Sequence, residues 1–414
     1  MPEAANGGMF RSLQHRNARI YFVGLLLSNI GTWIQFTATS LFLYDLKGNA
    51  TALGINAALQ FLPMLILGAW AGAVADRHNR LRITKVTQVL QALQALVLGA
   101  CVLAGVSSVA LVFVLTAFLG VVGAIDNPSR RGLISELVPT SDLSNGMSLN
   151  TATMTGSRIF GPTIAAALVG PLGVGWLFII NGVSYAAMLG GLFAIHKGDM
   201  HPATVAPAGG TPVRDGLRFV RDNERLRTLF IVFTLVSTFA FNYSVSLPKL
   251  ADLRWETPNA FGWVIGTTSV GSLIGALLTA RLAHATYRWV AWNVLVLAVA
   301  NLGMAFAPNV WIAFVWAIPL GLGGAAMMAG ITSLTQQEAP PEMRGRMLAL
   351  TAVAFLGSTP VGGPVTGLIA DTISAEWSLA YGGLIALVCG GWLLWWTTKL
   401  THRDERAPRL GETS

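Results

Sequence analysis

LGAWAGA, residues 67–73, is an apolar stretch that carries two glycines in GxxxG spacing, Gly68 and Gly72. The same spacing returns in a second apolar stretch at Gly271 and Gly275, which lie 203 residues further along the chain. A GxxxG pair lets two membrane helices approach closely, so the recurrence alone is a modest signal. The interval between the copies is the stronger observation, because a second landmark shares it.

That second landmark is the dipeptide Gly161-Pro162, which returns as Gly363-Pro364 after 202 residues. Two unrelated features with almost the same offset indicate that the chain contains a duplicated unit of about 200 residues. In an apolar chain, such a repeat is typical of transporters built from two pseudo-symmetric halves. The transport site of these proteins lies between the halves.

The composition restricts the class of protein. Of the 414 residues, 53% are hydrophobic and only 11% are charged, and the mean hydropathy is +0.60. A soluble protein of this size needs more polar surface than this, so the chain belongs to the membrane class.

The hydrophobic runs are long enough to cross a bilayer, since about 20 apolar residues span its hydrocarbon core as a helix. We predict twelve spans, at residues 19–45, 52–75, 83–105, 107–128, 143–169, 172–195, 228–250, 259–281, 287–307, 309–334, 345–370 and 377–398. The expected fold class is an all-α membrane protein with twelve transmembrane helices in two pseudo-symmetric six-helix halves. The first 18 residues are polar, so we expect no cleavable signal peptide.

The distribution of positive charge orients these helices. If the N-terminus is cytoplasmic, 23 of the 27 lysines and arginines fall on the cytoplasmic side. Three, Lys47, Lys249 and Arg254, fall outside, and Arg158 lies within a helix. The positive-inside rule therefore predicts that both termini are cytoplasmic, in the inner membrane. The formal charge of +8 is a topology signal, and we expect no nucleic-acid partner, because no basic soluble domain exists to bind one.

The chain divides into four predicted segments: an N-terminal half at 1–195, a cytoplasmic connector at 196–227, a C-terminal half at 228–399 and a cytoplasmic tail at 400–414. The connector starts with a linker rich in Pro, Ala and Gly. Its later part has an apolar stripe beside an arginine stripe, which predicts an interfacial helix at the headgroups. A solvated charged connector is the alternative.

The loop after the second predicted helix reads GAVADRHNRLR, from Gly72 to Arg82. It resembles the GxLaDrxGrkxxl signature of the major facilitator superfamily. The residues that match it are Gly72, Asp76, Arg77 and Arg80. Asn79 replaces the second glycine of the signature, and we expect Asn to tolerate the left-handed backbone there.

The resemblance implies that Asp76 faces the N-terminus of helix 11, where the helix dipole stabilises a carboxylate. It also implies that the basic residues of the loop pair with an acid at the base of helix 4, where Asp126 lies. Together these residues would form a latch that holds one conformation of the transport cycle. The alternative is that the charges only enforce topology.

Further stretches are similar to one exporter branch of this superfamily, which includes the enterobactin exporter and macrolide and multidrug efflux pumps. They are NIGTWIQ (29–35), LQFLP (59–63), DNPSRRGLISELVP (126–139), SRIFGP (157–162) and PPEMRGRM (340–347). The resemblance covers nearly the whole membrane region and implies an exporter without specifying its substrate.

Arg158 lies about 22 Å into the predicted fifth helix, at 1.5 Å per residue. A guanidinium at this depth costs several kcal/mol unless it meets water or a partner. Asp126 lies at a predicted inner helix end, and Asp45 and Asp371 at outer ends, so no carboxylate is expected near midspan. Arg158 therefore predicts a cavity residue that contacts an anionic or carbonyl-rich substrate. The alternative is a structural arginine bonded to backbone carbonyls.

Gly161-Pro162, with Gly156 before it, resembles a degenerate form of the antiporter motif gxxxGPxxGG. Gly363 and Pro364 form the copy in helix 11. Proline bends a membrane helix and small residues let a neighbour approach. The motif favours export, although plain packing of small residues would give the same pattern.

Other polar residues within predicted helices are candidates for lining the cavity. They are Asn29, Gln35, Asn150, Asn181, Asn242 and Tyr243. Each of them could instead form a hydrogen bond to a neighbouring helix.

These features predict a secondary transporter that exports a lipophilic or anionic small molecule by alternating access, coupled to proton antiport. The expected partners are the substrate, protons and the lipid bilayer, and the expected state is a monomer. We expect no cofactor, no metal site and no enzyme activity, because all six histidines lie in cytoplasmic segments and no catalytic set occurs. Uptake by the same fold and a transport-dead scaffold or sensor are the alternatives.

Overall fold

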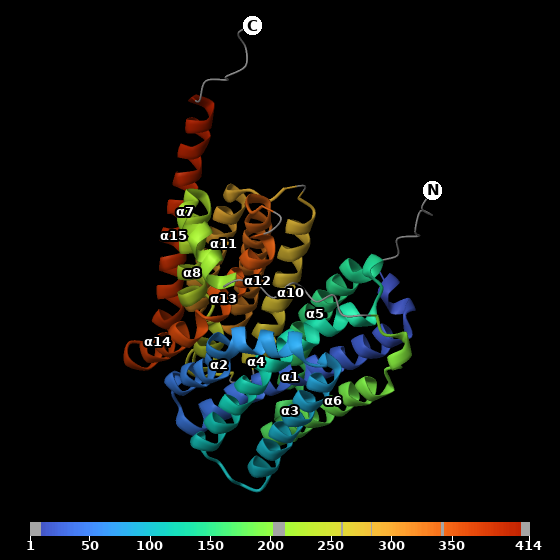
Figure 1. Cartoon of the computed structure of the whole chain (residues 1–414). Helices are drawn as coiled ribbons and strands as arrows, with labels where there is room; N and C mark the ends of the chain where they lie inside the picture. Colours follow the sequence, from blue (N-terminus) through green and yellow to red (C-terminus); the bar gives the residue numbers. More distant parts are fainter. Residues whose placement is uncertain (1–9, 202–211, 258–259, 283, 341–342, 407–414) are drawn as a thin grey trace. The chain divides into compact units, whose positions relative to one another are not determined.

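A computed structural model describes residues 10–201, 212–257, 260–282, 284–340 and 343–406 (Figure 1). All the regular secondary structure in these ranges is helical. The chain forms two compact units. Unit 1 comprises Met1–Gly209 with Thr257–Gly266, and unit 2 comprises Gly210–Glu256 with Thr267–Ser414.

Unit 1 contains the first six long helices. They are α1 (Arg16–Lys47), α2 (Ala50–Arg77), α3 (Arg80–Leu103), α4 (Val109–Leu137), α5 (Leu143–Leu172) and α6 (Val174–Ala194). Three short 3-10 turns accompany them: η1 (Arg11–Gln14), η2 (Thr140–Asp142) and η3 (Lys197–Asp199).

Unit 2 contains most of the remaining helices. They are α7 (Pro212–Asp222), α8 (Glu224–Ala240), α9 (Tyr243–Leu253), α11 (Tyr287–Ala305), α12 (Val310–Glu338), α13 (Arg344–Leu356), α14 (Thr359–Thr372) and α15 (Ala375–Arg406). Helix α10 (Ala260–Ala280) contributes its first residues to unit 1 and the rest to unit 2.

Eleven helices in the described residues are long and apolar enough to cross a membrane, with α8–α9 and α13–α14 each counted as one span. Helix α5, with 30 residues, is the further long helix, and its first half is polar. The all-α membrane fold predicted from the sequence is therefore confirmed.

Polar side chains cap the starts of α2, α3 and α4, and glycines end α1 and α5. Asn49 accepts a hydrogen bond from the Ala52 amide at 3.1 Å at the start of α2. Gly48 and Gly173 adopt positive φ angles of 63° and 78°, which bulkier residues avoid. Such caps satisfy backbone groups that a helix end leaves without partners.

Asn79 has a different role from the one we predicted. Its φ of −64° and ψ of 109° are extended rather than left-handed, and its side chain accepts from the Arg82 amide at 2.8 Å. Asn79 is thus the N-cap of α3. The prediction of a left-handed turn was wrong. The position favours Asn because its side chain caps the helix, and not because Asn tolerates a left-handed backbone.

The two units repeat one pattern of helix packing. In unit 1, α6 packs against α1 and α3, α5 packs against α1, and α4 packs against α2 and α3. In unit 2, α15 packs against α8 and α11, α14 packs against α8, and α12 packs against α11. Shifted by the repeat length, the four pairs of unit 2 correspond to four of the five pairs of unit 1. The three-dimensional pairing thus repeats as the glycine and Gly-Pro landmarks do.

The two GxxxG copies differ in their surroundings. An added Cβ at Gly271 or Gly275 would collide with the backbone carbonyls of Ile318 and Leu322 on α12, so these glycines allow close contact. At Gly68 and Gly72, no described atom lies within 4 Å of such a Cβ. Only the second copy therefore joins two helices within its own unit.

Two predicted helices are interrupted. The span predicted at 228–250 is divided at Phe241 and Asn242, and the span at 345–370 is divided at Gly357 and Ser358. Pro360 stands at the start of α14. Its ring would clash with the carbonyl of the residue four positions earlier in a continuous helix, which explains the second interruption.

Helix α4 is longer than predicted, ending at Leu137 rather than at residue 128. Asp126 therefore lies 17 residues into a helix of 29 residues, and it is not at a helix end. The prediction that no carboxylate lies well within a span was wrong. The charged sequence of residues 126–136 suggested a loop, but Asp126, Arg130 and Glu136 form ion pairs inside the unit.

Large apolar side chains are exposed on the outer faces of many helices. Ile66, Phe193 and Val388 are 68%, 68% and 73% exposed. On the inner face of α1, by contrast, Tyr21 and Leu25 are fully buried. An apolar outer face on a helix with a packed inner face is the pattern of a helix surrounded by lipid.

Asp142 joins the segment before α1 to the turn between α4 and α5. His15 Nε2 lies 2.8 Å from Asp142 Oδ2, and Arg11 forms an ion pair with Asp142 Oδ1. The hydrogen bond from His15, followed by that from Arg11, lowers the pKa of the Asp142 carboxyl against the opposing effect of its burial. These contacts hold η1 and the residue before α1 against the turn between α4 and α5.

The predicted interfacial helix corresponds to α7. It packs against α13, with Val220 buried and Asp215 Oδ2 at 3.2 Å from Arg346 Nη1. Leu217 is 53% exposed, so part of the apolar stripe remains available for lipid. Most of the predicted linker, residues 202–211, lies outside the described residues.

Candidate functional site

The loop between α2 and α3 forms a charged cluster at the end of unit 1. Arg80 is buried, and its Nη2 donates to Asp76 Oδ1 at 3.1 Å. Its Nη1 lies 3.4 Å from Glu136 Oε1, and its Nε donates to the Ala75 carbonyl at 3.3 Å. The guanidinium thus ties the ends of α2 and α4 together.

The acid that pairs with this loop is Glu136, not Asp126 as predicted. Glu136 lies one residue before the end of α4, next to the loop, whereas Asp126 lies ten residues earlier in the helix. The prediction was wrong because it ended helix 4 too early. Glu136 was present in the quoted stretch 126–139, and a longer helix would have identified it.

Asp76 and Arg77, two further members of the predicted latch, lie at the surface. The Asp76 side chain is 65% exposed, and Arg77 is also exposed. Gly72 is half-buried within α2. Asp76 therefore has room for a further partner besides Arg80.

A second charged cluster lies deeper in unit 1, between α1, α3 and α4. Asp126 Oδ2 is 3.2 Å from Arg130 Nε, one turn further along α4. The other carboxylate oxygen accepts from the Thr87 hydroxyl at 2.6 Å and from Gln88 at 3.3 Å, both on α3. Asn29 on α1 lies 3.4 Å from Arg130 Nη1. The Asp126 side chain is only 3% exposed.

Gln35 and Asn181, both predicted to line a cavity, bind each other. Asn181 Nδ2 donates to Gln35 Oε1 at 2.7 Å, and Gln35 Nε2 donates to Gln94 Oε1 at 3.0 Å. All three side chains are buried, and Gln94 Nε2 has no partner among the described residues. Gln35 and Asn181 therefore form interhelical hydrogen bonds, which is the alternative that the sequence left open.

Arg158 lies on an exposed face of α5, 15 residues after the helix starts. Its guanidinium carbon is 5.0 Å from the centre of the Trp33 ring on α1, which is a cation–π contact. Asn29 Nδ2 lies 3.1 Å from Met154 Sδ, one helical turn before Arg158. Asn150, a further turn back, is half-buried.

Gly161 is the point of closest contact between α5 and α1. A Cβ there would lie 2.9 Å from the Ile30 carbonyl oxygen and still closer to Trp33 Cβ. Gly156 has no described atom within 4 Å of an added Cβ, so it is not a packing glycine. Pro162 is buried inside α5, where the helix continues through it.

In unit 2, the interruptions of the two broken helices lie together. Asn242 Nδ2 donates to the Thr238 carbonyl at 2.5 Å, and a Cβ at Gly362 would collide with that same carbonyl. The Phe241 and Phe355 rings pack edge to face, with centres 5.4 Å apart. The sequence prediction found Asn242 and missed these aromatic neighbours.

Tyr243 starts α9, and its ring centre lies 6.4 Å from that of Phe241. Gly363 and Pro364 lie inside α14, after the interruption at Gly357 and Ser358. The break in this span therefore precedes the Gly-Pro dipeptide, and any bend at Pro364 would be additional to it.

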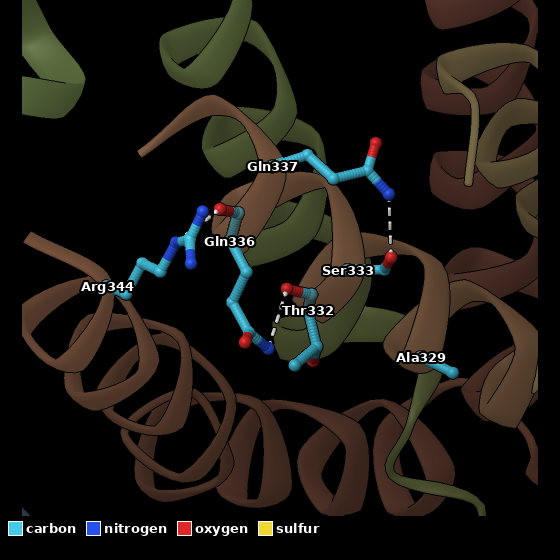
Figure 2. A pocket seen from close by; sticks show the side chains of 6 residues that line it. All are labelled: Ala329, Thr332, Ser333, Gln336, Gln337 and Arg344. Atoms are coloured by element: carbon cyan, nitrogen blue, oxygen red, sulfur yellow. Dashed lines mark hydrogen bonds between the residues drawn. The ribbon is translucent and has the colours of Figure 1, made fainter. Parts of the chain in front are cut away.

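A polar depression of about 510 Å³ lies at the end of α12 and the start of α13. Figure 2 shows its lining side chains, among them Gln336, Gln337 and Arg344. Arg344 Nε donates to the Gln336 carbonyl at 3.2 Å, and Gln337 donates to the Ser333 hydroxyl at 2.9 Å. These side chains donate to backbone carbonyls and to a hydroxyl of the same lining residues, and none of them was among the predicted site residues.

Comparison with known proteins identifies the family. The model of the family described as "Transmembrane secretion effector" matches residues 8–410. The chain is a member of this family of major facilitator superfamily transporters.

Two relatives and one solved structure illustrate the similarity. The transporter is 27% identical over 368 residues to the multidrug efflux pump Tap of Mycolicibacterium fortuitum, covering 84% of this chain and 87% of that protein. It is 21% identical over 380 residues to the staphyloferrin A transporter of Staphylococcus aureus, covering 90% and 94%. A POT family transporter solved with a thioalcohol-conjugated peptide has a TM-score of 0.76 at 12% identity, covering 93% and 97%. The last comparison supports the fold alone.

Several residues of the transporter's charged clusters were not predicted from the sequence. They are Thr87, Gln88, Arg130 and Glu136. Arg130 and Glu136 lie after the predicted end of the fourth helix at residue 128, so they were not considered as residues within a span. Thr87 and Gln88 are neutral, and such residues carry little signal in a membrane helix. Within the described residues, no group of three or more His, Cys, Asp or Glu side chains could hold a metal ion.

Proposed function

We propose that the transporter exports a lipophilic or anionic small molecule by alternating access, with proton antiport as the driving reaction. Membership of a transporter family supports transport of a small molecule. The names of two relatives, a multidrug efflux pump and a staphyloferrin A transporter, support a substrate of this size and kind.

Arg158 is the observation that carries the substrate class. A guanidinium about 22 Å into a membrane helix is costly unless it faces water or a polar group. Its guanidinium lies over the Trp33 ring, so the pair combines a cation that can donate to oxygen atoms with the apolar surface of the indole. An amphipathic molecule with carbonyl or carboxylate oxygens satisfies both groups.

The latch is the second part of the proposal. Asp76 is mostly exposed, and α13 begins at Arg344 after Met343, without a side-chain cap from the described residues. We propose that Asp76 caps this helix N-terminus in one state of the cycle, since a carboxylate there is stabilised by the helix dipole. Loss of that contact would then favour the opposite state.

We further propose an inner-membrane location with both termini cytoplasmic. The charge asymmetry between the two sides supports this orientation. In this orientation Asp76, Glu136 and the start of α13 all lie at the cytoplasmic side, as the latch requires.

The test compares inverted and right-side-out membrane vesicles that contain the wild-type transporter or Arg158→Ala. The compounds are radiolabelled erythromycin, ethidium and staphyloferrin A, each with and without an imposed pH gradient. We expect inverted vesicles, acidic inside, to accumulate at least one compound, and Arg158→Ala to reduce this by about tenfold or more. Accumulation only in right-side-out vesicles would indicate uptake, and accumulation in neither would support a scaffold or sensor.

A further inference from the structure

Asp126 is the carboxylate most deeply placed within a membrane-spanning helix among the described residues. It lies 11 residues before the end of α4, which corresponds to about 16 Å along the helix. The other paired acids of the transporter lie close to helix ends, as Glu136 and Asp371 do. An ionisable side chain at such depth is expensive and usually serves transport.

The contacts of Asp126 fix the position of its carboxyl group and still allow it to take up a proton. One oxygen pairs with Arg130 at 3.2 Å, and the other accepts from Thr87 at 2.6 Å and Gln88 at 3.3 Å. Apart from Arg130, these donors are neutral, so a neutral carboxyl can remain hydrogen-bonded at the same place. Protonation therefore needs only the separation of one ion pair.

The remaining titratable groups around the pair are few. The Tyr21 hydroxyl on α1 donates to the Arg130 carbonyl at 3.0 Å, and Tyr185 on α6, whose hydroxyl lies 3.1 Å from that of Thr32, interacts with both charges electrostatically. Helix α3 contacts the carboxylate through Thr87 and Gln88, while its charged residues Arg80, Arg82 and Lys85 lie in its first two turns, and α2 carries no charged residue before Asp76. Among the described residues, these neighbouring helices therefore place no second carboxylate beside Asp126.

Arg130 connects the carboxylate to the predicted substrate side. Its Nη1 lies 3.4 Å from Asn29 Oδ1, and the Asn29 amide nitrogen lies 3.1 Å from Met154 Sδ. Arg158 is one turn further along α5, over Trp33. A guanidinium released by Asp126 thus has Asn29 within reach, on the helix that also carries Trp33.

We infer that the Asp126 carboxylate is the group that binds and releases the coupled proton, with Arg130 as its charge partner. This inference rests on the proposed proton antiport. A proton from water forms an O–H bond at Asp126, and the carboxylate becomes neutral. Arg130 then loses its counter-charge, keeps its contact with Asn29 and can pair with anionic substrate oxygens. Deprotonation restores the ion pair.

The first test reads the proton directly and needs no substrate. Purified transporter in nanodiscs is titrated with acid while infrared difference spectra record the C=O stretch of protonated carboxyl groups. We expect one band of the wild type to be missing in Asp126→Asn and present in Glu136→Gln, the matched change in the same helix. A wild-type band pattern in Asp126→Asn, or loss of the same band in both variants, would overturn the inference.

The second test measures the consequence for transport of whichever of the three vesicle compounds accumulates. We expect wild-type rates at acid and alkaline pH to differ by about tenfold, and those of Asp126→Asn to lose this dependence. Asp126→Glu should restore part of it, and thermal unfolding checks that each variant is folded. Full pH dependence in a folded Asp126→Asn would refute the assignment.

The two tests separate the inference from the proposed function. If none of the compounds accumulates in wild-type vesicles, the proposed export fails, while the infrared titration still decides whether Asp126 takes up a proton. If transport occurs and Asp126→Asn behaves as wild type in both tests, the proposed function stands and the assignment fails.

Discussion

Gly161→Ala is the substitution whose effect the structure defines most closely. The new methyl group would lie 2.9 Å from the Ile30 carbonyl oxygen and even closer to Trp33 Cβ. Both belong to α1, so neither can move without shifting that helix. Overpacking of this kind costs about 1–3 kcal/mol, and replacing glycine in a helix interior returns roughly 0.5–1 kcal/mol.

Gly156→Ala is the matched control, five residues earlier on α5. It gains the same helix propensity and meets no described atom within 4 Å. The two variants should therefore differ by about 1–3 kcal/mol in their free energy of unfolding. For a unit of this size, that corresponds to an unfolding temperature lower by about 2–12 °C in Gly161→Ala.

The assay is thermal unfolding of both purified variants in the same detergent, followed by intrinsic tryptophan fluorescence. Since Trp33 lies at the contact, Gly161→Ala should also change its emission before unfolding begins. Equal unfolding temperatures for the two variants would refute the reasoning, because they would show that α1 and α5 are not in close contact at Gly161.

Four further predictions concern charge. In a background without native cysteines, Asp199→Cys should resist labelling by impermeant maleimide from outside intact cells, and efficient labelling would reverse the orientation. Asp76→Asn should remove a charge–dipole contact of about 0.3–1 kcal/mol and slow transport without reducing membrane insertion; wild-type turnover would leave the aspartate a topology charge. Because the folded pKa of Asp142 lies below its usual 3.8 through the hydrogen bond from His15, its contribution to stability is present above that value and is lost as the pH falls through the folded pKa. Asp142→Asn should therefore flatten the acid side of the unfolding temperature measured against pH, and parallel curves would contradict this. Arg158→Lys should restore transport only in part relative to Arg158→Ala, since an ammonium lacks the planar fork; an unfolded alanine variant would indicate a structural arginine.

The fold could be predicted from the sequence almost completely. Long apolar runs and the 203-residue recurrence of Gly68 and Gly72 led to an all-α membrane protein with a repeat, and the structure has both. The interruptions were missed. Pro360 was available as a signal, but hydropathy averaged over a span does not distinguish one continuous helix from two short ones.

The site could be predicted in part. The loop motif predicted that a basic residue of this loop pairs with an acid of helix 4, and Arg80 does pair with an acid of α4. It led to the wrong acid, since choosing between Asp126 and Glu136 depends on where α4 ends relative to α2 and α3. The partners of Gln35 could not be predicted either, because Asn181 and Gln94 lie on helices that meet α1 only after folding.

The sequence by itself determined which segments enter the membrane. The free energy of transfer into lipid is a sum over the residues of a segment, so the composition and charge of a segment determine whether it enters the membrane. Only the tertiary structure decided which polar groups meet within the bilayer. Asp126 and Arg130 share α4, but the contacts of Asp126 with Thr87 and Gln88 depend on the rotation and register of α3 against α4. These are set by packing contacts that are individually small and spread over whole helices.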